Sequence, residues 1–336
     1  MDSLIAKTTP KAIRLALKRL QREPKAANDD KKSQALDSAY KQAMERIESQ
    51  EGGFQELAKR VLSWITCAKR PLTILELQHA LAVEVGESEL DKENLLEIED
   101  MVSVCAGLVT IDDETSIIRL VHYTTQEYFE RTWINWFPNA QIDITETCVT
   151  YLLFNSFETG LCSTDEDFEV RLQLNPLYSY AAQNWGHHAR TALKEVEVLI
   201  FHFLKSEAKG SASIQAMMAR HTYSGYSQET PRRTTGAHLI AYFGLQEAMI
   251  TFIEHGHDPN LKDTRGWTAL SWAAVYGHEA VVKLLLANDS VDANSADNTG
   301  RTPLWWAAVN RHIAVVKLLL ARSEEHTSEL QSPVLS

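Results

Sequence analysis

The sequence predicts a mainly α-helical protein with a winged helix that carries a small β-hairpin, a helical domain, and a short solenoid of helical repeats. Two observations indicate this class. The stretch GWTALSWAAVYGHEAVVKLLLA from Gly266 is nearly repeated by GRTPLWWAAVNRHIAVVKLLLA from Gly300, and the spacing (300 − 266 = 34 residues) is typical of a helical-repeat solenoid. Two β-rich runs, 108–111 and 117–121, flank turn-forming residues, which predicts one hairpin among the helices.

The first segment, residues 1–35, is predicted to be a helix followed by a linker. Ile13, Leu17 and Leu20 share one helical face among basic residues, a pattern also found at membranes and in calmodulin targets. We interpret this face instead as a stripe that packs on the end of a domain lying outside this chain. The polar, charged stretch around Pro24 then forms the linker.

Residues 36–135 are predicted to form the winged helix. Apolar spacing indicates helices over 36–49, 54–67 and 97–106. Another helix is expected to begin at Thr73, because Glu76 follows at the spacing of a capping box. Helices followed by a hairpin make a winged helix.

This winged helix is not expected to bind DNA. DNA-binding winged helices need a basic recognition helix. The corresponding segment here holds Glu97, Glu99 and Asp100 and no basic residue.

Residues 136–230 follow as a helical domain and a polar linker. The pair His187 and His188 suggests a metal site, but adjacent residues on a helix point about 100° apart, and no second pair stands nearby. We therefore expect a structural role for both, and no metal or other cofactor. The cysteines sit singly in apolar patterns without a CxxC pair, which indicates reduced core residues: Cys67, Cys105, Cys148 and Cys162.

Residues 235–321 are predicted to hold about three repeats, of which the first is a weaker copy, AHLIAYFGLQEAMITFIEHGHDPN. Thr302 and Pro303 start a helix, because the Thr hydroxyl caps free amides and Pro fits the first turn. Gly277 supplies a positive φ between two helices. The last copy has Arg311 at that position, which should strain or reshape the turn.

These copies resemble the ankyrin repeat, whose signature has Gly, Thr-Pro-Leu, paired alanines, Gly-His and a Val-Val-x-Leu-Leu helix. The resemblance implies a surface that binds a protein partner through hairpin tips and inner-helix faces. Trp272 and Trp306, 306 − 272 = 34 residues apart, are expected to fill the core between repeats. The implied contact residues are Arg265, Trp267, Val275, Tyr276, Arg301, Val309 and Asn310.

Composition and charge exclude several other classes. The chain is 44% hydrophobic and 23% charged, as is ordinary for globular proteins. No apolar run approaches the roughly 18 to 20 residues that a membrane helix needs, and no signal-peptide core is present, so a cytoplasmic protein without membrane contact is expected. Residues 1–231 carry 24 basic and 34 acidic residues, a net charge of 24 − 34 = −10, which argues against nucleic acid as a partner.

A second resemblance covers residues 36 to about 190. The stretches AKRVLSWITCAKRPLTILELQHALAV, EDMVSVCAGLV and IIRLVHYTTQEYF are similar to the winged helix that follows the NACHT nucleotide-binding domain in fungal NACHT-ankyrin proteins, relatives of the NOD-like receptors. The same module is catalogued with GPI inositol-deacylase-like proteins. The resemblance implies that His122 contacts the phosphate of ADP held by the NACHT domain. The alternative, which this chain taken alone favours, is a structural histidine that bonds a backbone carbonyl at a strand end.

Motifs for catalysis are missing from the sequence. GxxxxGK[ST] is absent, so NTP hydrolysis cannot be organised, and no GxSxG elbow indicates a serine hydrolase. We therefore expect a non-enzymatic chain without catalytic residues, acting as a protein-interaction and regulatory module of a NOD-like signalling receptor. Its partners would be a protein bound by the ankyrin repeats and the NACHT domain of the full-length protein. The alternatives are a fragment of a GPI inositol-deacylase-like hydrolase and a DNA-binding winged-helix protein.

The last segment, residues 322–336, is predicted to be an artefactual or disordered tail. RSEEHTSELQS resembles the in-frame translation of a sequencing adapter, and the alternative is a genuine polar tail. In both cases no polar capping repeat follows the last copy. We therefore expect an exposed apolar face at the end of the solenoid, made of Val315, Val316, Leu318 and Leu319.

Overall fold

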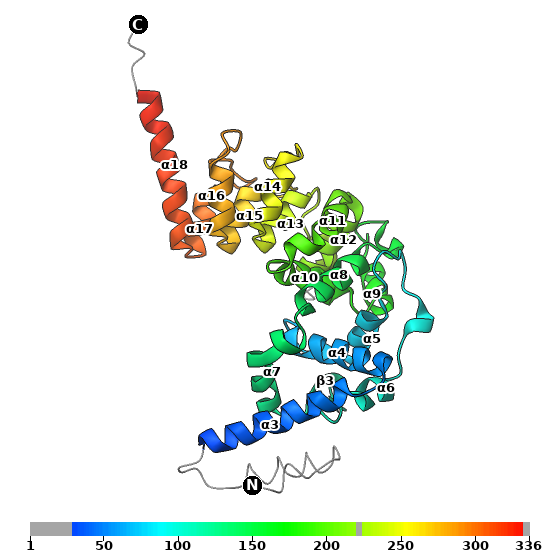
Figure 1. The fold of residues 1–336 in the computed structure, drawn as a ribbon. Helices are drawn as coiled ribbons and strands as arrows, with labels where there is room; N and C mark the ends of the chain where they lie inside the picture. Colours follow the sequence, from blue (N-terminus) through cyan, green and yellow to red (C-terminus); the bar gives the residue numbers. More distant parts are fainter. Residues whose placement is uncertain (1–28, 220–223, 332–336) are drawn as a thin grey trace. The chain divides into compact units, whose positions relative to one another are not determined.

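The computed structural model describes residues 29–219 and 224–331, and it shows the mainly helical chain that the sequence predicts (Figure 1). The described chain divides into two compact units, one of residues 29–84 and 90–144 and the other of residues 85–89 and 145–331. The apolar stripe predicted around Leu17 lies outside the described residues, and so do the last five residues of the predicted tail.

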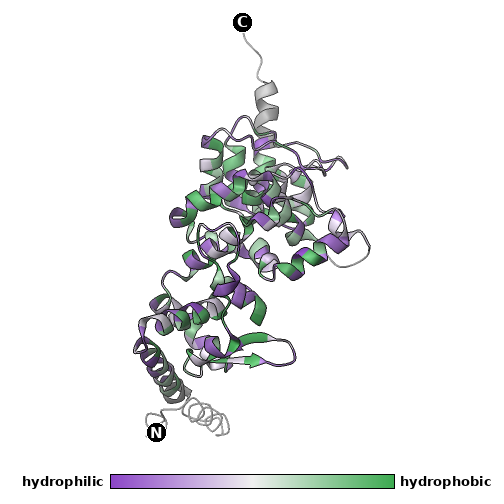
Figure 2. Cartoon of the chain, turned by 90° about the vertical axis from the view of Figure 1, so that its right-hand side faces the viewer, coloured by the Kyte–Doolittle hydropathy of each residue, from purple (hydrophilic) through white to green (hydrophobic). Residues whose placement is uncertain are grey.

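The first unit contains the winged helix. Its elements are α3 (Asp29–Glu48), α4 (Gly52–Cys67), β1 (Leu72–Thr73), α5 (Ile74–Ala82), the 3-10 turn η1 (Lys92–Asn94), α6 (Ile98–Ser103), β2 (Val109–Asp112), β3 (Ile117–Leu120), α7 (Tyr123–Trp136) and the start of α8 (Ala140–Leu152). The predicted hairpin is confirmed as β2 and β3, which pair antiparallel with Val109 opposite Leu120. Figure 2 shows this hairpin as mostly hydrophobic, and its residues Val109, Ile118 and Leu120 are buried.

The predicted capping box at the start of α5 is confirmed. Thr73 Oγ1 accepts the amide of Glu76 at 3.2 Å, and the Glu76 carboxylate accepts the amide of Thr73 at 2.8 Å. Arg70 adds two charge-assisted hydrogen bonds to the same carboxylate, at 2.5 and 3.0 Å. These bonds fix where α5 begins, directly after the strand that joins the sheet.

Two features of the first unit differ from the sequence-based expectation. The helix α3 begins at Asp29, so the last residues of the predicted linker are helical, because no helix breaker follows Pro24. The strand β1 was not predicted: its two residues pair with Ile118 and Ile117, giving the strand order β1-β3-β2 among the described residues. A two-residue strand carries no periodicity that a sequence pattern can reveal.

The second unit contains the helical domain and the repeats. Its elements are the rest of α8, the 3-10 turn η2 (Asn155–Phe157), α9 (Asp165–Leu174), α10 (Tyr178–Ala189), α11 (Leu193–Lys205), α12 (Glu207–Met218), the 3-10 turn η3 (Tyr226–Gln228), α13 (Gly236–Phe243), α14 (Gln246–Glu254), α15 (Ala269–Tyr276), α16 (Glu279–Leu286), α17 (Pro303–Val309) and α18 (Ile313–Gln331). We call α13–α18 with their loops the repeat stack.

The helical domain covers the first repeat of the stack. Helices α10, α11 and α12 all contact α13, and α11 also contacts α14. Phe243 of α13 packs against Trp185 with ring centroids 4.8 Å apart, and a Cβ added to Gly186 would overlap the Cβ and Cγ atoms of Phe243. Glycine therefore lets α10 approach α13 closely.

At the other end of the stack, the structure corrects two expectations. Helix α18 continues to Gln331, so residues 322–331 are helical rather than a disordered tail. Val315 and Leu319 are buried rather than exposed, because these residues, four apart, turn toward α16 and α17. Val316 and Leu318 are half-buried. The exposed apolar residues of α18 are instead Ile313 and Leu320, with 69% and 44% of their surfaces accessible.

None of the helices in the described ranges 29–219 and 224–331 has the length and hydropathy needed to cross a membrane.

Candidate protein-binding site

The repeat stack consists of two rows of helices. The inner helices α13, α15 and α17 pack side by side, and so do the outer helices α14, α16 and α18 (Figure 1). The inner helices begin at capped threonines: Thr268 Oγ1 accepts the amide of Ser271, and Thr302 Oγ1 accepts the amide of Trp305. Pro303 occupies the first turn of α17, so the predicted Thr-Pro start is confirmed.

Histidines tie each repeat to the one before it. The Nε2 of His278 donates to the carbonyl of Tyr242 at 2.7 Å, and the Nε2 of His312 donates to the carbonyl of Val275 at 2.9 Å. Each imidazole lies over a glycine of the preceding repeat: a Cβ on Gly244 or Gly277 would lie 2.5 Å from the Nδ1 of the corresponding histidine. These glycines are thus required by packing as well as by their positive φ.

The turn at Arg311 keeps the geometry of its glycine counterparts. Gly277 has a φ of 73°, as predicted, and Arg311 has a φ of 60°. The turn is therefore strained rather than reshaped, since a side chain in this region costs about 1 kcal/mol. Among the described residues, no histidine of a following repeat lies over Arg311, which leaves room for its side chain.

Buried aspartates organise the loops that precede the inner helices. Asp263 accepts the backbone amides of Arg265 and Trp267 on one oxygen and the Trp272 indole on the other. Asp297 likewise accepts the amides of Thr299 and Arg301, and its second oxygen accepts two indole N–H groups, from Trp267 at 3.2 Å and Trp306 at 3.0 Å. Asp297 therefore joins two repeats.

These hydrogen bonds keep the carboxyl group of Asp297 ionised. Burial acts to raise the pKa of its carboxyl group, but hydrogen bonds from Thr299, from the Arg301 amide and from the Trp306 indole outweigh burial. The result is a pKa lowered from 3.8 to about 2. The aspartate is thus an anion throughout the physiological range.

The residues that the sequence predicted for partner contact fall into three groups. Arg265, Tyr276, Arg301, Val309 and Asn310 are exposed. Trp267 is half-buried, and its ring lies 4.6 Å from that of Trp306. Val275 is half-buried, with its carbonyl occupied by His312. Of the predicted core residues, Trp272 is fully buried, whereas Trp306 is only half-buried.

Trp305 belongs to this surface and was missed by sequence reasoning. Its side chain is 39% exposed, and the guanidinium of Arg301 lies 4.3 Å from its ring centroid. A signal was present: the equivalent positions of the first two repeats hold His238 and Ser271, which are buried in their caps. A tryptophan three residues after the capping threonine cannot play that role and must turn outward.

In the first unit, His122 is the N-cap of α7. Its Nδ1 accepts the backbone amide of Thr124 at 3.2 Å and lies 2.8 Å from the Thr124 hydroxyl, which in turn lies 2.6 Å from the Tyr40 hydroxyl. Because Nδ1 accepts an amide proton, the proton of the neutral ring sits on Nε2. Burial lowers the pKa of His122, so the neutral form dominates at pH 7. The backbone partner of Nδ1 is thus the amide of Thr124.

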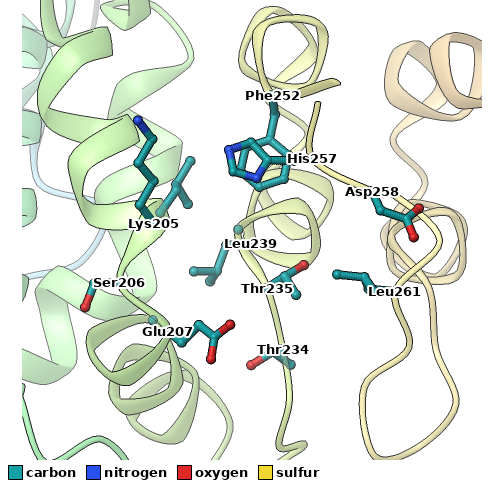
Figure 3. A pocket seen from close by; sticks show the side chains of 13 residues that line it. Lys205, Ser206, Glu207, Thr234, Thr235, Leu239, Phe252, His257, Asp258 and Leu261 are labelled. Carbon is teal, nitrogen blue, oxygen red and sulfur yellow. The ribbon is translucent and has the colours of Figure 1, made fainter. Parts of the chain in front are cut away.

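A small cavity of about 170 Å³ lies between the helical domain and the first repeat (Figure 3). Lys205 and Glu207 line it from α11 and α12, and His257 stacks on Phe252 with ring centroids 4.0 Å apart. Pockets for small molecules measure about 300 to 1,000 Å³. The cavity is therefore smaller than a cofactor site.

The histidine pair and the cysteines have structural positions. His188 is buried and its Nε2 lies 2.9 Å from the Tyr180 hydroxyl, while His187 packs against Phe243. The cysteines are free and buried, as predicted, and burial raises the pKa of each thiol, to about 11 for Cys67 and about 12 for Cys105. Over the described part of the chain, no three His, Cys, Asp or Glu side chains gather as metal ligands would.

Comparisons with known families match the winged helix and the repeats. A family model described as "Ankyrin repeats (3 copies)" matches residues 237–329, and one described as "GPI inositol-deacylase, winged helix domain" matches residues 44–135. The chain therefore carries a winged-helix domain of the deacylase-associated type and ankyrin repeats.

Relatives among curated proteins are partial. The azaphilone pigments biosynthesis cluster protein L of Monascus ruber is 30% identical over 185 residues, which cover 49% of this chain and 37% of that protein. Calmodulin-binding transcription activators 4 and 6 of Arabidopsis thaliana are 37% and 44% identical over 51 and 50 residues, each covering 15% of this chain and 5% and 6% of those proteins. The chain thus matches little more than a third of the first relative and small parts of the others.

Proposed function

We propose that this chain is a non-enzymatic protein-interaction and regulatory module of a NOD-like signalling receptor, and that its ankyrin repeats bind a protein partner. The observation that carries the proposal is the group of exposed side chains Tyr276, Trp305 and Val309 on the neighbouring inner helices α15 and α17. Exposed aromatic and apolar residues on a rigid scaffold are typical of protein interfaces.

Several observations favour a role without catalysis. The thiols are buried and protonated, which makes poor nucleophiles. The sequence contains neither a phosphate-binding loop nor a nucleophile elbow. The composition of α6 argues against the DNA-binding alternative, since its first turn holds Glu99 and Asp100 and the helix contains no basic residue. The free cysteines favour a reducing compartment, and we place the protein in the cytoplasm.

A random-peptide display library tests the binding role. The immobilised full chain is the bait, and Tyr276→Ser/Trp305→Ser/Val309→Ser is the matched bait without the proposed face. We expect peptides that bind the unaltered chain at least about ten-fold better than this variant. Leu174→Ser/Val198→Ser removes two exposed apolar residues from α9 and α11 and should leave binding unchanged. Equal recovery on all baits would refute the proposal.

Within a longer receptor, we propose that the Nε2–H of His122 donates to the phosphate of ADP bound by a NACHT domain. The support is the tautomer that Thr124 imposes and the position of the ring at the N-terminus of α7, where anions are favoured. In a protein in which a NACHT domain precedes this chain, His122→Ala should accelerate the release of fluorescent ADP. An unchanged release rate would contradict this role.

A further inference from the structure

Four arginines line the loops that lead into the inner helices of the ankyrin stack. Arg232 and Arg233 precede α13, Arg265 precedes α15 and Arg301 precedes α17, and all four are exposed. We call them the arginine row. The loops are bonded to one another in order: the Thr264 amide donates to the carbonyl of Arg232 at 2.9 Å, and the Asn298 amide donates to the carbonyl of Arg265 at 3.0 Å. The row is therefore held on one rigid edge.

These arginines lack the carboxylate partners found elsewhere in the molecule. Arg70, Arg119, Arg131 and Arg322 each form an ion pair with an aspartate or glutamate. Among the described residues, no member of the arginine row does so. Arg265 donates to the carbonyl of Glu229, and Arg301 lies over the rings of Trp305 and Trp306.

In the described part of the chain the acidic residues near this edge form no ion pair with the arginine row, and one exposed acid, Glu229, directly precedes it. Asp263 and Asp297 are buried, and their oxygens are used by backbone amides and indoles. Three of the exposed acids lie on the outer helices, Glu247, Glu254 and Glu279, whereas Asp258, Asp289 and Asp292 lie in the same loops as Arg265 and Arg301. Of these, Asp289 is paired with Arg322. The repeats balance overall, with 8 basic and 8 acidic residues in 232–321.

One exposed aromatic side chain lies beside the arginine row, and two further exposed apolar residues lie at the opposite ends of the inner helices. Trp305 is next to Arg301, and Tyr276 and Val309 are exposed at the ends of α15 and α17. Guanidinium groups form bidentate hydrogen bonds with carboxylates, and a guanidinium stacked on an indole is already oriented for them. The edge thus offers a row of cations with the exposed ring of Trp305 beside Arg301.

We propose that this edge binds an acidic, extended segment of a partner protein. Its carboxylates pair with the arginine row and an apolar side chain contacts Trp305, and the segment continues along the inner helices to Tyr276 and Val309. This inference rests on the proposed protein-binding function and adds the chemistry of the ligand. Arginine clusters that recognise acidic motifs are a recurring mode of peptide binding.

The test uses the full chain and three labelled probes in fluorescence anisotropy. The first is a peptide that alternates glutamate with leucine, the second has every glutamate replaced by glutamine, and the third is oligothymidylate of equal charge. The glutamate peptide should bind at least about ten-fold tighter than both others, and its binding should weaken as NaCl rises from about 0.05 to about 0.5 M. Tighter binding of the oligonucleotide would show that the edge selects phosphate, and would overturn the proposal.

Matched variants separate this edge from the general charge of the protein. Arg232→Ala/Arg265→Ala/Arg301→Ala should weaken binding of the glutamate peptide at least about thirty-fold. Lys194→Ala/Lys283→Ala/Lys317→Ala removes the same charge from exposed positions on α11, α16 and α18 and should change it less than about three-fold. Equal effects of the two triple variants would overturn the proposal.

The display library distinguishes failure of this inference from failure of the proposed function. Enriched peptides that are not acidic, but still require Tyr276 and Trp305, would refute the acidic ligand and leave protein binding standing. If no peptides depend on the face, the protein-binding function itself fails. Acidic peptides that lose binding in the triple arginine variant are the expected result.

Discussion

The two ends of the repeat stack differ in whether other helices cover them. At the first repeat, Leu239, Ile240 and Phe243 are buried where α10, α11 and α12 pack on α13. At the last repeat, Ile313 and Leu320 are largely exposed, and no described element covers them. In a solenoid each repeat is stabilised by its neighbours. Similar repeats should therefore tolerate substitutions differently, with the covered end least tolerant.

The largest effect is expected at the covered end, from Gly186→Ala. The new Cβ would overlap the Cβ and Cγ of Phe243, atoms too close to the backbone to move aside. We expect the free energy of unfolding of the second unit to fall by about 3 kcal/mol or more. Urea unfolding monitored by tryptophan fluorescence measures this loss. Gly53→Ala adds a methyl group to α4 where no atom lies within 4 Å, and should have little effect. Similar midpoints for both variants would break the comparison.

The next largest effect is expected between the second and third repeats, from Gly277→Ala. The positive φ and the contact with His312 both oppose a side chain, and together should cost about 2 kcal/mol. Gly256→Ala is the matched control, since its φ is 81° and no atom lies within 4 Å of the added Cβ. It should cost about 1 kcal/mol. If the two variants melt at the same temperature, the histidine contact contributes nothing.

A smaller loss is expected from Asp297→Asn, about 1.5 kcal/mol at pH 7, because the amide would place N–H donors against other donors. The effect should depend on pH. The folded-state pKa of Asp297 is lowered, so its contribution is complete above about 4 and is lost as the pH falls toward about 2. Urea unfolding of the unaltered protein and of Asp297→Asn should give free energies of unfolding that converge as the pH falls from about 4 toward about 2. A constant difference would contradict the role of the charge.

The smallest effect is expected at the exposed end, from Arg311→Gly, which should stabilise the protein rather than destabilise it. Relief of the left-handed strain should stabilise the last repeat by about 0.5 kcal/mol, after the greater flexibility of glycine in the unfolded chain is offset. Hydrogen exchange at residues 303–320 should slow slightly. Arg311→Ala keeps the strained backbone and should bring no gain. A gain of equal size from alanine would show that strain is not the cause.

Much of the fold could be predicted because its signals are local. The 34-residue period, the cap at Thr73 and the turn between β2 and β3 all lie within short windows of sequence. The burial of Val315 and the strand at Leu72 could not be predicted, since each depends on a partner distant in the chain or on a packing angle. Only part of the arginine row could be predicted from the sequence. Hydrogen bonds between loops bring its members into line, and no regular spacing in the sequence reveals this alignment.

The tryptophans that Asp297 gathers give the stack an optical property of its own. The rings of Trp267 and Trp306 have centroids 4.6 Å apart, and those of Trp305 and Trp306 lie 4.8 Å apart. Indoles at such separations couple their electronic transitions, and the resulting exciton bands appear in circular dichroism only while the rings keep their mutual angles. Trp267 precedes α15 and Trp306 lies in α17, so the exciton signal reports on the packing between these two repeats without an added label.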